Sequence, residues 1–202
     1  MIFMSNYIYH YTSMSGLKGI IESGCINLGI FTTADDPKII YNYAISLTTD
    51  LSPYGHGLTV GEEINQQQAI YLGEFSEGHG DHSGKLFSVN RIKFRLKIDL
   101  DKVNLTSAVD YYKVNSKVLR ALEITALYPL LDSKVKENND FLVIKGNDPS
   151  IQGKGDTWYF SFSPINIKQS VVAIQFLNSE EMQYIEYDLD SFLYIWQSEA
   201  NK

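Results

Sequence analysis

The chain has 202 residues, a mass of 22.9 kDa and a formal net charge of −7 at pH 7, so we do not expect the broad basic surface with which proteins bind duplex DNA. A hydrophobic content of 44% argues against disorder, and a single cysteine, Cys25, excludes an internal disulfide and fits a reducing, cytoplasmic compartment. No basic segment followed by an apolar run opens the sequence, and no run of about 18 apolar residues is present, so no membrane association is expected.

The opening segment, "YIYHYTSMSGLKGIIESGCI", predicts a strand followed by a helix. Residues 6–10 are rich in strand-favouring aromatic side chains, and Thr12 or Ser13 can cap the helix with a side-chain oxygen. Gly24 supplies the left-handed residue that ends such helices. The apolar face of the helix recurs at helical spacing: Met14, Leu17, Ile20 and Ile21.

The next segments predict strands on either side of a long loop. "DDPKIIYNYAISLTTD" indicates a short helical or turn segment that leads into a strand over residues 44–48. Residues 50–84 are rich in Gly, Ser, His and Glu and are expected to form a loop, with "IYLGEF" as a short strand inside it. "NRIKFRLKIDL" alternates apolar and basic residues strictly, which is typical of a half-buried strand with one polar face.

The last third mixes helices and strands. "SAVDYYKVNSKVLRALEITALYPLL" predicts helix in two pieces that end before Pro129. "DTWYFSF" and "SVVAIQFL" predict strands, and "DLDSFLYIWQSEA" predicts a final helix that Asp188 or Asp190 can cap. No repeat or linker interrupts this order, so we expect one α+β domain over residues 1–202.

Two polar strand ends are candidates for a binding site. His10 and Thr12 alternate along the first strand and therefore point to one side, and in "ISLTTD" Ser46 and Thr48 share a face. If the two strands are neighbours, an imidazole and several hydroxyls converge and can bind a flat amide and ribose hydroxyls without a metal. The alternative is that His10 and the hydroxyls are structural residues at strand ends.

A histidine in "PYGHGL" is a second candidate. Gly55 and Gly57 flank His56, so the backbone can approach a ligand closely and the imidazole can project over the site as an acid, a base or a phosphate partner. The alternative is a flexible surface loop. The "EGHGDHSGK" segment offers His79, Asp81 and His82, but without a fixed frame or specific spacing, so no metal is expected.

The basic face of "RIKFRLKI" is the one concentration of positive charge. Arg91 or Arg95 can give bidentate contacts to a pyrophosphate or a nucleic-acid backbone. A solvent-facing strand edge that is protected from aggregation by charge is an equal alternative.

Three of these segments, in order, resemble motifs of the ADP-ribosyltransferase superfamily, in particular the branch that contains the DarT toxins and the RNA 2′-phosphotransferases. "YIYHYTSMSGLKGIIESGCI" is similar to the first motif, an aromatic–His–Thr strand followed by a helix that ends in Gly. "AISLTTD" is similar to the second, and "TWYFSFSPINIKQSVVAIQF" resembles the third, two strands around a Pro-containing turn. The resemblance implies a fold of split mixed β-sheets with flanking helices, and NAD as substrate without a metal.

The resemblance also implies roles for individual residues. His10 would bind the NAD ribose, Tyr11 and Thr12 would belong to the same NAD-binding segment, and Ser46 and Thr48 would support the nicotinamide ribose. Tyr41, Tyr43 or, preferably, Tyr54 would stack on the nicotinamide ring. Members of the superfamily usually carry a glutamate near the start of the third-motif strand, where this chain has Asp156 and Trp158; aspartate can supply the same charge, whereas tryptophan cannot.

The leading hypothesis is therefore an NAD-dependent ADP-ribosyltransferase, a glycosyltransferase such as a toxin or phage-conflict effector, in which His10, Asp156 and His56 act in catalysis. Its acceptor would be a nucleic acid or a protein, and a neutralising partner protein would be among its partners. The second hypothesis is a catalytically degenerate member of the same fold that binds a nucleotide or a protein. The third is an RNA-processing enzyme akin to the 2′-phosphotransferases, although no paired arginines stand near His56.

Overall fold

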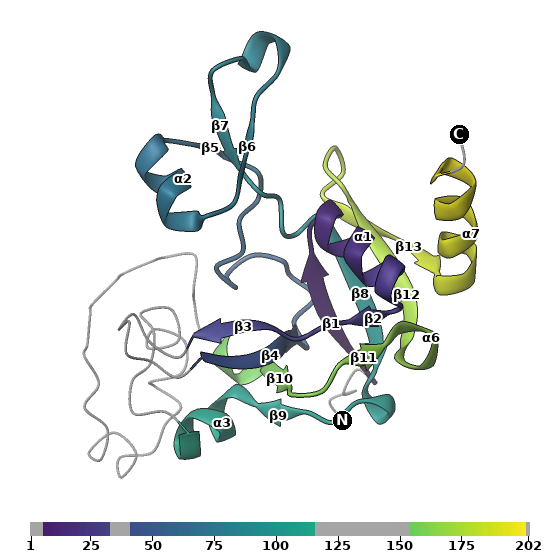
Figure 1. The fold of residues 1–202 in the computed structure, drawn as a ribbon. Helices are drawn as coiled ribbons and strands as arrows, with labels where there is room; N and C mark the ends of the chain where they lie inside the picture. The colour runs from purple at the N-terminus through teal and green to yellow at the C-terminus, as the bar shows by residue number, and fades with distance from the viewer. Residues whose placement is uncertain (1–5, 33–40, 116–153, 201–202) are drawn as a thin grey trace.

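The computed structural model describes residues 6–32, 41–115 and 154–200, which form an α+β fold around one eight-stranded sheet (Figure 1). The strand order is β13-β12-β8-β1-β4-β10-β9, with β3 paired to β4. Their bounds are β1 (Tyr7–Thr12), β3 (Gly29–Thr32), β4 (Tyr41–Thr48), β8 (Phe94–Asp99), β9 (Thr106–Ser107), β10 (Trp158–Ser161), β12 (Val171–Asn178) and β13 (Gln183–Asp188). The expected α+β class is confirmed, and every described pairing is antiparallel where mixed sheets were expected.

The first strand and helix form where they were predicted, but β1 extends to Thr12, whereas the strand was expected over residues 6–10. Helix α1 (Met14–Ser23) begins at Ser13, whose hydroxyl accepts a hydrogen bond from the Gly16 amide, and ends at Gly24, whose φ of 71° is left-handed. Leu17 and Ile20 are buried against the main sheet. Each fully buried aliphatic side chain of this kind contributes about 1.5–3 kcal/mol, so this contact anchors α1 on the sheet.

The core lies between the sheet and the helices on one of its faces. Its buried members from the sheet include Ile8, Leu47, Leu96 and Ile174. The covering helices are α1, α6 (Ile167–Ser170) and α7 (Leu189–Ala200), which contribute buried or partly buried apolar side chains to the same cluster. Asp188 accepts a hydrogen bond from the Ser191 amide at 2.9 Å and so caps α7, one of the two caps that the sequence allowed.

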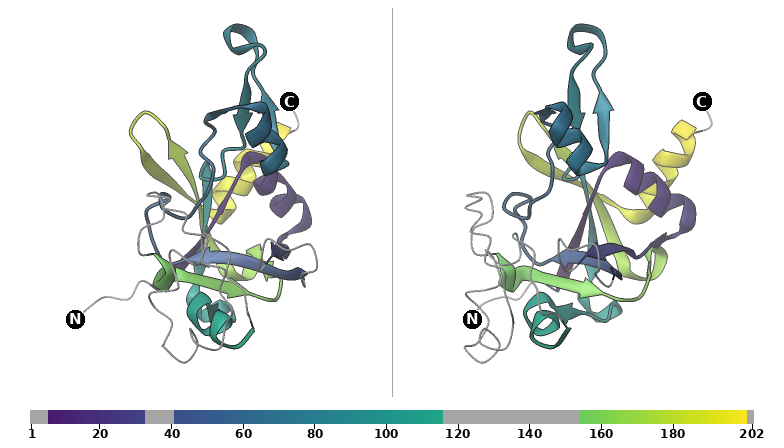
Figure 2. Two further views of the ribbon diagram at one scale, coloured as in Figure 1. Left: turned by 90° about the vertical axis from the view of Figure 1, so that its left-hand side faces the viewer. Right: turned by 60° about the vertical axis from the view of Figure 1, so that its left-hand side comes forward.

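The remaining described strands form two smaller sheets. β2 (Cys25–Ile26) pairs with β11 (Ile165–Asn166), and a three-stranded sheet has the order β5-β7-β6. The second of these belongs to a projecting segment, residues 62–88, which we call the arm: β5 (Glu63–Ile64), α2 (Gln66–Leu72), β6 (Phe75–Glu77), a 3₁₀ turn (Gly80–His82) and β7 (Leu86–Ser88). The arm stands away from the main sheet in all three ribbon views (Figures 1 and 2).

The arm overturns the prediction of a strand over "IYLGEF". Ile70 and Leu72 belong to α2, which Gly73 ends, and only Phe75 enters a strand. The helix forms because Asn65 and Gln68 build a reciprocal capping box, each side chain bonded to the other residue's backbone amide at 2.9 Å.

Other predictions fall partly outside the described residues. Of the two helical pieces expected between residue 107 and Pro129, α3 (Ala108–Asn115) is described and the second piece is not. The helical or turn segment expected before β4 begins at Asp35, and its residues 35–40 are likewise outside the described part; β4 itself begins at Tyr41, three residues before the expected start. Among the helices that are described, none has the length and apolar character needed to cross a membrane.

Candidate functional site

The candidate site lies where β1 and β4 separate. β1 pairs with β8 along its whole length but with β4 only through Tyr9 and Thr48. Beyond that pair the two strands diverge, and β4 continues in pairs with β3 and β10. The imidazole of His10 spans the fork: its Nδ1 lies 3.0 Å from the carbonyl oxygen of Ser46.

The tautomer of His10 follows from its partner. A carbonyl oxygen only accepts hydrogen bonds, so we assign the ring proton to Nδ1, which leaves the lone pair on Nε2. Burial lowers the pKa of His10, and the hydrogen bond to Ser46 opposes this shift only in part. At neutral pH the fork therefore presents an uncharged imidazole whose second nitrogen can accept a hydrogen bond.

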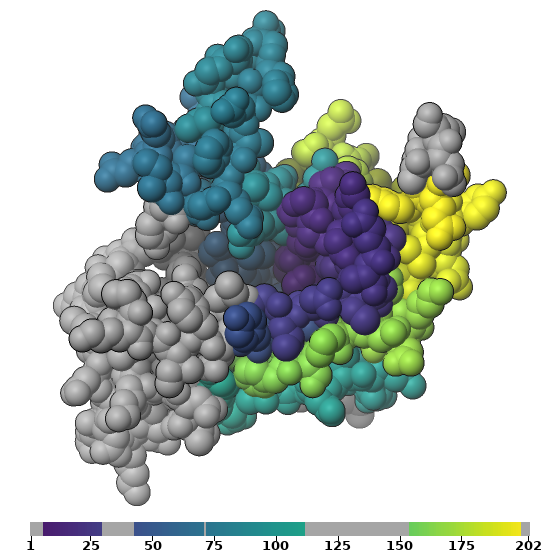
Figure 3. All heavy atoms as spheres, viewed as in Figure 1, coloured from purple at the N-terminus to yellow at the C-terminus, as the bar shows by residue number. Residues whose placement is uncertain are grey.

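A cavity of about 760 Å³ opens at this fork. Its walls are β1, the first turns of α1, the strands β4 and β10, and residues 56–58 of the loop after β4. Glu74 and Arg91, at the base of the arm, close another side, and the surface in Figure 3 is recessed between the arm and α1. The volume lies in the range of small-molecule sites, about 300–1,000 Å³.

The cavity brings together seven of the residues that the sequence singled out. These are His10, Tyr11, Thr12, Ser46, Thr48, His56 and Arg91. Tyr54, Arg95 and Asp156 are not among the lining residues, and neither is Tyr43. The side chain of Tyr41 lies outside the described part of the structure.

Thr12 sits under the start of α1. Its side chain is 8% exposed, and its hydroxyl has no hydrogen-bond partner among the described residues. Gly16 lies so close that a Cβ built there would approach Thr12 Oγ1 at 2.2 Å. Thr12 thus keeps a buried hydroxyl at the cavity wall, beside the positive end of a ten-residue helix.

The two hydroxyl residues of β4 differ in their surroundings. Ser46 is exposed, whereas Thr48 is buried and bonded to the hydroxyl of Thr157 at 3.1 Å and to the amide of Asp50 at 3.0 Å. The pairing of Tyr9 with Thr48 also puts Thr48 on the sheet face of Tyr9, not on that of His10. The convergence expected for all four residues therefore holds for the cavity wall but not for the hydroxyls of Thr48 and of Ser46, which share one face of β4.

His56 is fixed, and the expectation of a freely projecting ring is wrong. The indole nitrogen of Trp158 donates to Nδ1 at 2.8 Å, so the ring proton is on Nε2, which lies 3.1 Å from the carbonyl oxygen of Ser52. The side chain is 6% exposed. Burial lowers the pKa of His56 and the charge of Lys154 lowers it further, so the ring is neutral and shapes the cavity wall.

A carboxylate and an ammonium hold the same loop. Asp50 lies 2.6 Å from the Nζ of Lys154 and accepts a hydrogen bond from the Ser52 amide at 2.9 Å. Burial acts to raise the pKa of Asp50, but these bonds outweigh it and keep the pKa below its ordinary value. Lys154 also donates to the carbonyl oxygen of Tyr54, which is half-exposed outside the cavity.

Arg95 is a structural residue, and its predicted role as a phosphate contact is not supported by its position. It is 7% exposed, with its guanidinium 4.8 Å from the ring centre of Tyr9 and 3.9 Å from that of Tyr184. Its nitrogens donate to Gln175 and, at 2.6 Å, to the Leu51 carbonyl. The supposed solvent face of β8 is thus covered, and Arg95 ties the loop after β4 to the sheet.

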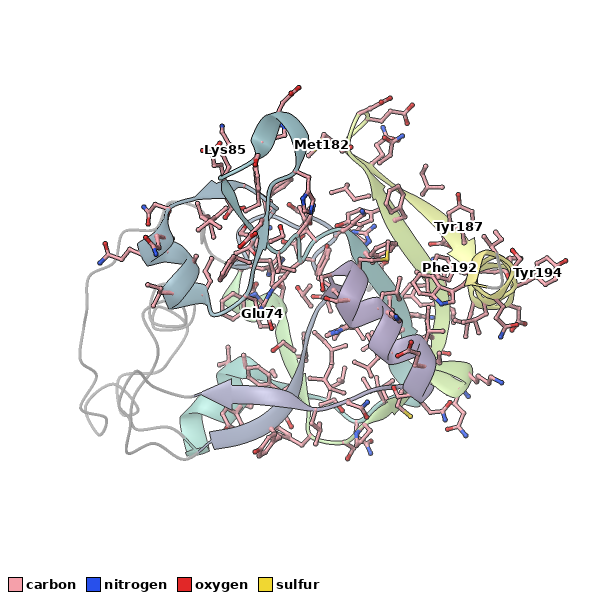
Figure 4. The ribbon with its side chains drawn as sticks, turned by 45° about the horizontal axis from the view of Figure 1, so that its top comes forward. Glu74, Lys85, Met182, Tyr187, Phe192 and Tyr194 are labelled. Atoms are coloured by element: carbon pink, nitrogen blue, oxygen red, sulfur yellow. The ribbon has the colours of Figure 1, made fainter. Side chains whose placement is uncertain are left out.

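The carboxylate of the site is not the one that the sequence suggested. Asp156 is exposed in the turn before β10 and does not line the cavity. Glu74 does, and among the described lining residues it is the only carboxylate, as Arg91 is the only Arg or Lys. Their side chains form an ion pair at 2.9 Å, and Glu74 lies at the inner end of the arm (Figure 4). No sequence motif marks Glu74.

No group of three or more His, Cys, Asp or Glu residues that could hold a metal occurs in the described ranges. No family model, curated protein or solved structure matches this chain.

Proposed function

We propose that the cavity binds NAD and that the chain transfers ADP-ribose from it to an acceptor. The observation that supports this is the neutral imidazole at the strand fork, which shares one cavity with the buried hydroxyl of Thr12, a helix N-terminus and an arginine. A dinucleotide needs this combination: acceptors and donors for ribose hydroxyls, aromatic surface for its rings, and positive charge for its pyrophosphate.

In this proposal each part of NAD binds to a different group of cavity residues. His10 Nε2 accepts a hydrogen bond from a ribose hydroxyl, with the hydroxyl of Thr12 on the same face of β1. Arg91 and the first amides of α1 bind the pyrophosphate. An aromatic residue of β10 replaces Tyr54 at the ring site, because Trp158, Tyr159 and Phe160 line the cavity and Tyr54 does not.

Transfer breaks the bond between the ribose carbon and the nicotinamide nitrogen. Nicotinamide leaves with the electron pair, the acceptor forms the new bond at the same carbon, and the acceptor gives up a proton. The developing positive charge on the ribose needs a nearby anion, and Glu74 replaces Asp156 in that role. Arg91 holds this carboxylate until a phosphate competes for the guanidinium.

The test is calorimetry with NAD, followed by an assay of nicotinamide release. His10→Ala removes the ring, and His10→Asn keeps a donor near the position of Nδ1 but lacks the Nε2 acceptor. Both should lower NAD affinity at least about tenfold and abolish release, whereas His79→Ala, on an exposed arm residue, should do neither. Full affinity in both His10 variants would remove the assignment.

A second function, binding without chemistry, is favoured by one observation. No carboxylate from the turn before β10 or from β10 itself lines the cavity, and Glu74 is already paired with Arg91. A degenerate binding module would bind NAD in the calorimeter and release no nicotinamide. If the chain is a conflict toxin, its expression should arrest growth and His10→Ala should relieve the arrest; harmless expression of the wild type counts against that role.

A further inference from the structure

The arm begins at the mouth of the cavity. Its two stems are tied together at the base, where the Arg91 amide donates to the Thr59 carbonyl at 2.9 Å and the Arg91 side chain pairs with Glu74. Glu74 and Arg91 both line the cavity, while Lys85 lies farther out along the arm (Figure 4). A molecule bound to the arm is therefore held next to the cavity entrance.

The arm carries a groove of its own. A hollow of about 520 Å³ lies between α2 and the three strands of the arm. Its apolar lining consists of Ile64, Ala69, Ile70, Phe75 and Leu86. Ile70 is 76% exposed and Phe75 is 46% exposed. Contact of apolar surface with water is unfavourable, so a bound apolar side chain that covers these two residues would lower the free energy of the complex.

The charge of the arm is strongly one-sided. Between Glu62 and Ser88 the sequence has five carboxylates and one lysine. That lysine, Lys85, is paired with Glu63 at 2.7 Å. Glu63, Lys85 and Glu77 all line the groove, and Glu77 has no ion-pair partner among the described residues. The groove thus combines an apolar floor with one uncompensated carboxylate on its rim.

We infer that the arm docks the acceptor, and that this acceptor is a polypeptide segment in which an apolar side chain is flanked by lysine or arginine. The inference rests on the proposed function and names the substrate class for the same site. An apolar side chain fits the floor of the groove, and cationic neighbours fit its rim. A nucleic acid, with one negative charge on each phosphate, would be repelled by the carboxylates that lead to the cavity.

Binding is tested first, without NAD, by fluorescence anisotropy. The probes are a fluorescein-labelled peptide of alternating lysine and leucine and a labelled single-stranded oligonucleotide of mixed sequence. The wild type should prefer the peptide, Glu77→Lys should weaken peptide binding about tenfold, and Ile70→Ser should weaken it several-fold. Glu180→Lys, the same charge change at the exposed β12–β13 turn, should leave it within about twofold.

A second measurement separates this inference from the proposed function. With biotin-labelled NAD, the wild type should label the peptide, and Glu77→Lys should lose that label while its nicotinamide release without acceptor stays unchanged. Preference for the oligonucleotide in either assay, or peptide binding that is equal in Glu77→Lys and Glu180→Lys, overturns the inference. Absence of nicotinamide release with groove-dependent peptide binding overturns the transfer function and leaves the docking surface standing.

Discussion

The close approach of Gly16 to Thr12 gives a direct test of how α1 is seated over the cavity. Gly16→Ala adds one methyl group, whose carbon would lie 2.2 Å from Thr12 Oγ1, far inside any normal contact. Thr12→Ala removes that oxygen. In the double variant the nearest atoms are Ser13 Oγ at 3.5 Å and Cβ of residue 12 at 3.6 Å, which are ordinary van der Waals distances.

Gly16→Ala should change the free energy of unfolding in opposite directions in the wild type and in the Thr12→Ala variant. Alanine in place of glycine in a helix stabilises it by up to about 1 kcal/mol. Overpacking of a closed site costs about 1–3 kcal/mol, and the β-branched Thr12 has few rotamers with which to move away. Gly16→Ala alone should therefore lower the free energy of unfolding by about 1–2 kcal/mol, but should raise it by up to about 1 kcal/mol in the Thr12→Ala background.

Urea unfolding of the four proteins, followed by circular dichroism, measures this coupling. We expect an interaction free energy of about 2–3 kcal/mol between the two substitutions. The matched control is Gly19→Ala, where an added Cβ would meet nothing within 4 Å and the effect should not depend on residue 12. Additive effects of Gly16→Ala and Thr12→Ala would refute the contact on which the shape of this wall depends.

Three further predictions concern the residues around the cavity. Trp158→Phe removes the donor to His56 Nδ1 and should lower the free energy of unfolding by about 1–2 kcal/mol; an unchanged urea midpoint would contradict this bond. Because burial lowers the pKa of His10 and His56, the unfolded chain takes up protons below pH about 6.5 that the folded chain does not. Stability should be full above that pH and fall as the pH drops, by at most about 1.4 kcal/mol per unit for each ring, and a flat profile between pH 7.5 and 5.5 would exclude the two neutral rings. Arg95→Lys should cost about 2–4 kcal/mol by urea unfolding, because one ammonium replaces neither the fork of donors nor the stacking; a loss below about 0.5 kcal/mol would contradict the buried role.

The parts of the fold that local chemistry determines could be predicted from the sequence. The β1–α1 unit is one example: aromatic residues, a serine cap, an apolar stripe and Gly24 all specify the same local structure. The placement of His10 on the first strand followed from this unit, although His10 lies inside β1, which continues to Thr12, and not at its end. That it faces β4 required only that the two strands be neighbours, which they are.

The rest depends on contacts between distant residues. The register that turns Thr48 away from His10, and the indole that immobilises His56 from 102 positions along the chain, leave no local pattern. Glu74 reaches the cavity only because the arm folds back on Arg91. Arg95 looked like a solvent-facing residue because strand alternation predicts which face a side chain occupies, and not whether rings cover that face.

The bond from His10 to Ser46 also governs how far the main sheet closes. The carbonyl oxygen of Ser46 bonds to a side chain of β1 and not to a backbone amide, so the imidazole lies between the two strands at the point where their pairing stops. Without the imidazole, the carbonyl oxygen of Ser46 would be free to accept a hydrogen bond from a backbone amide of β1, and the space between the two strands, where the cavity lies, would narrow. Substitution of His10 would then remove both the hydrogen bond and the space for a ligand.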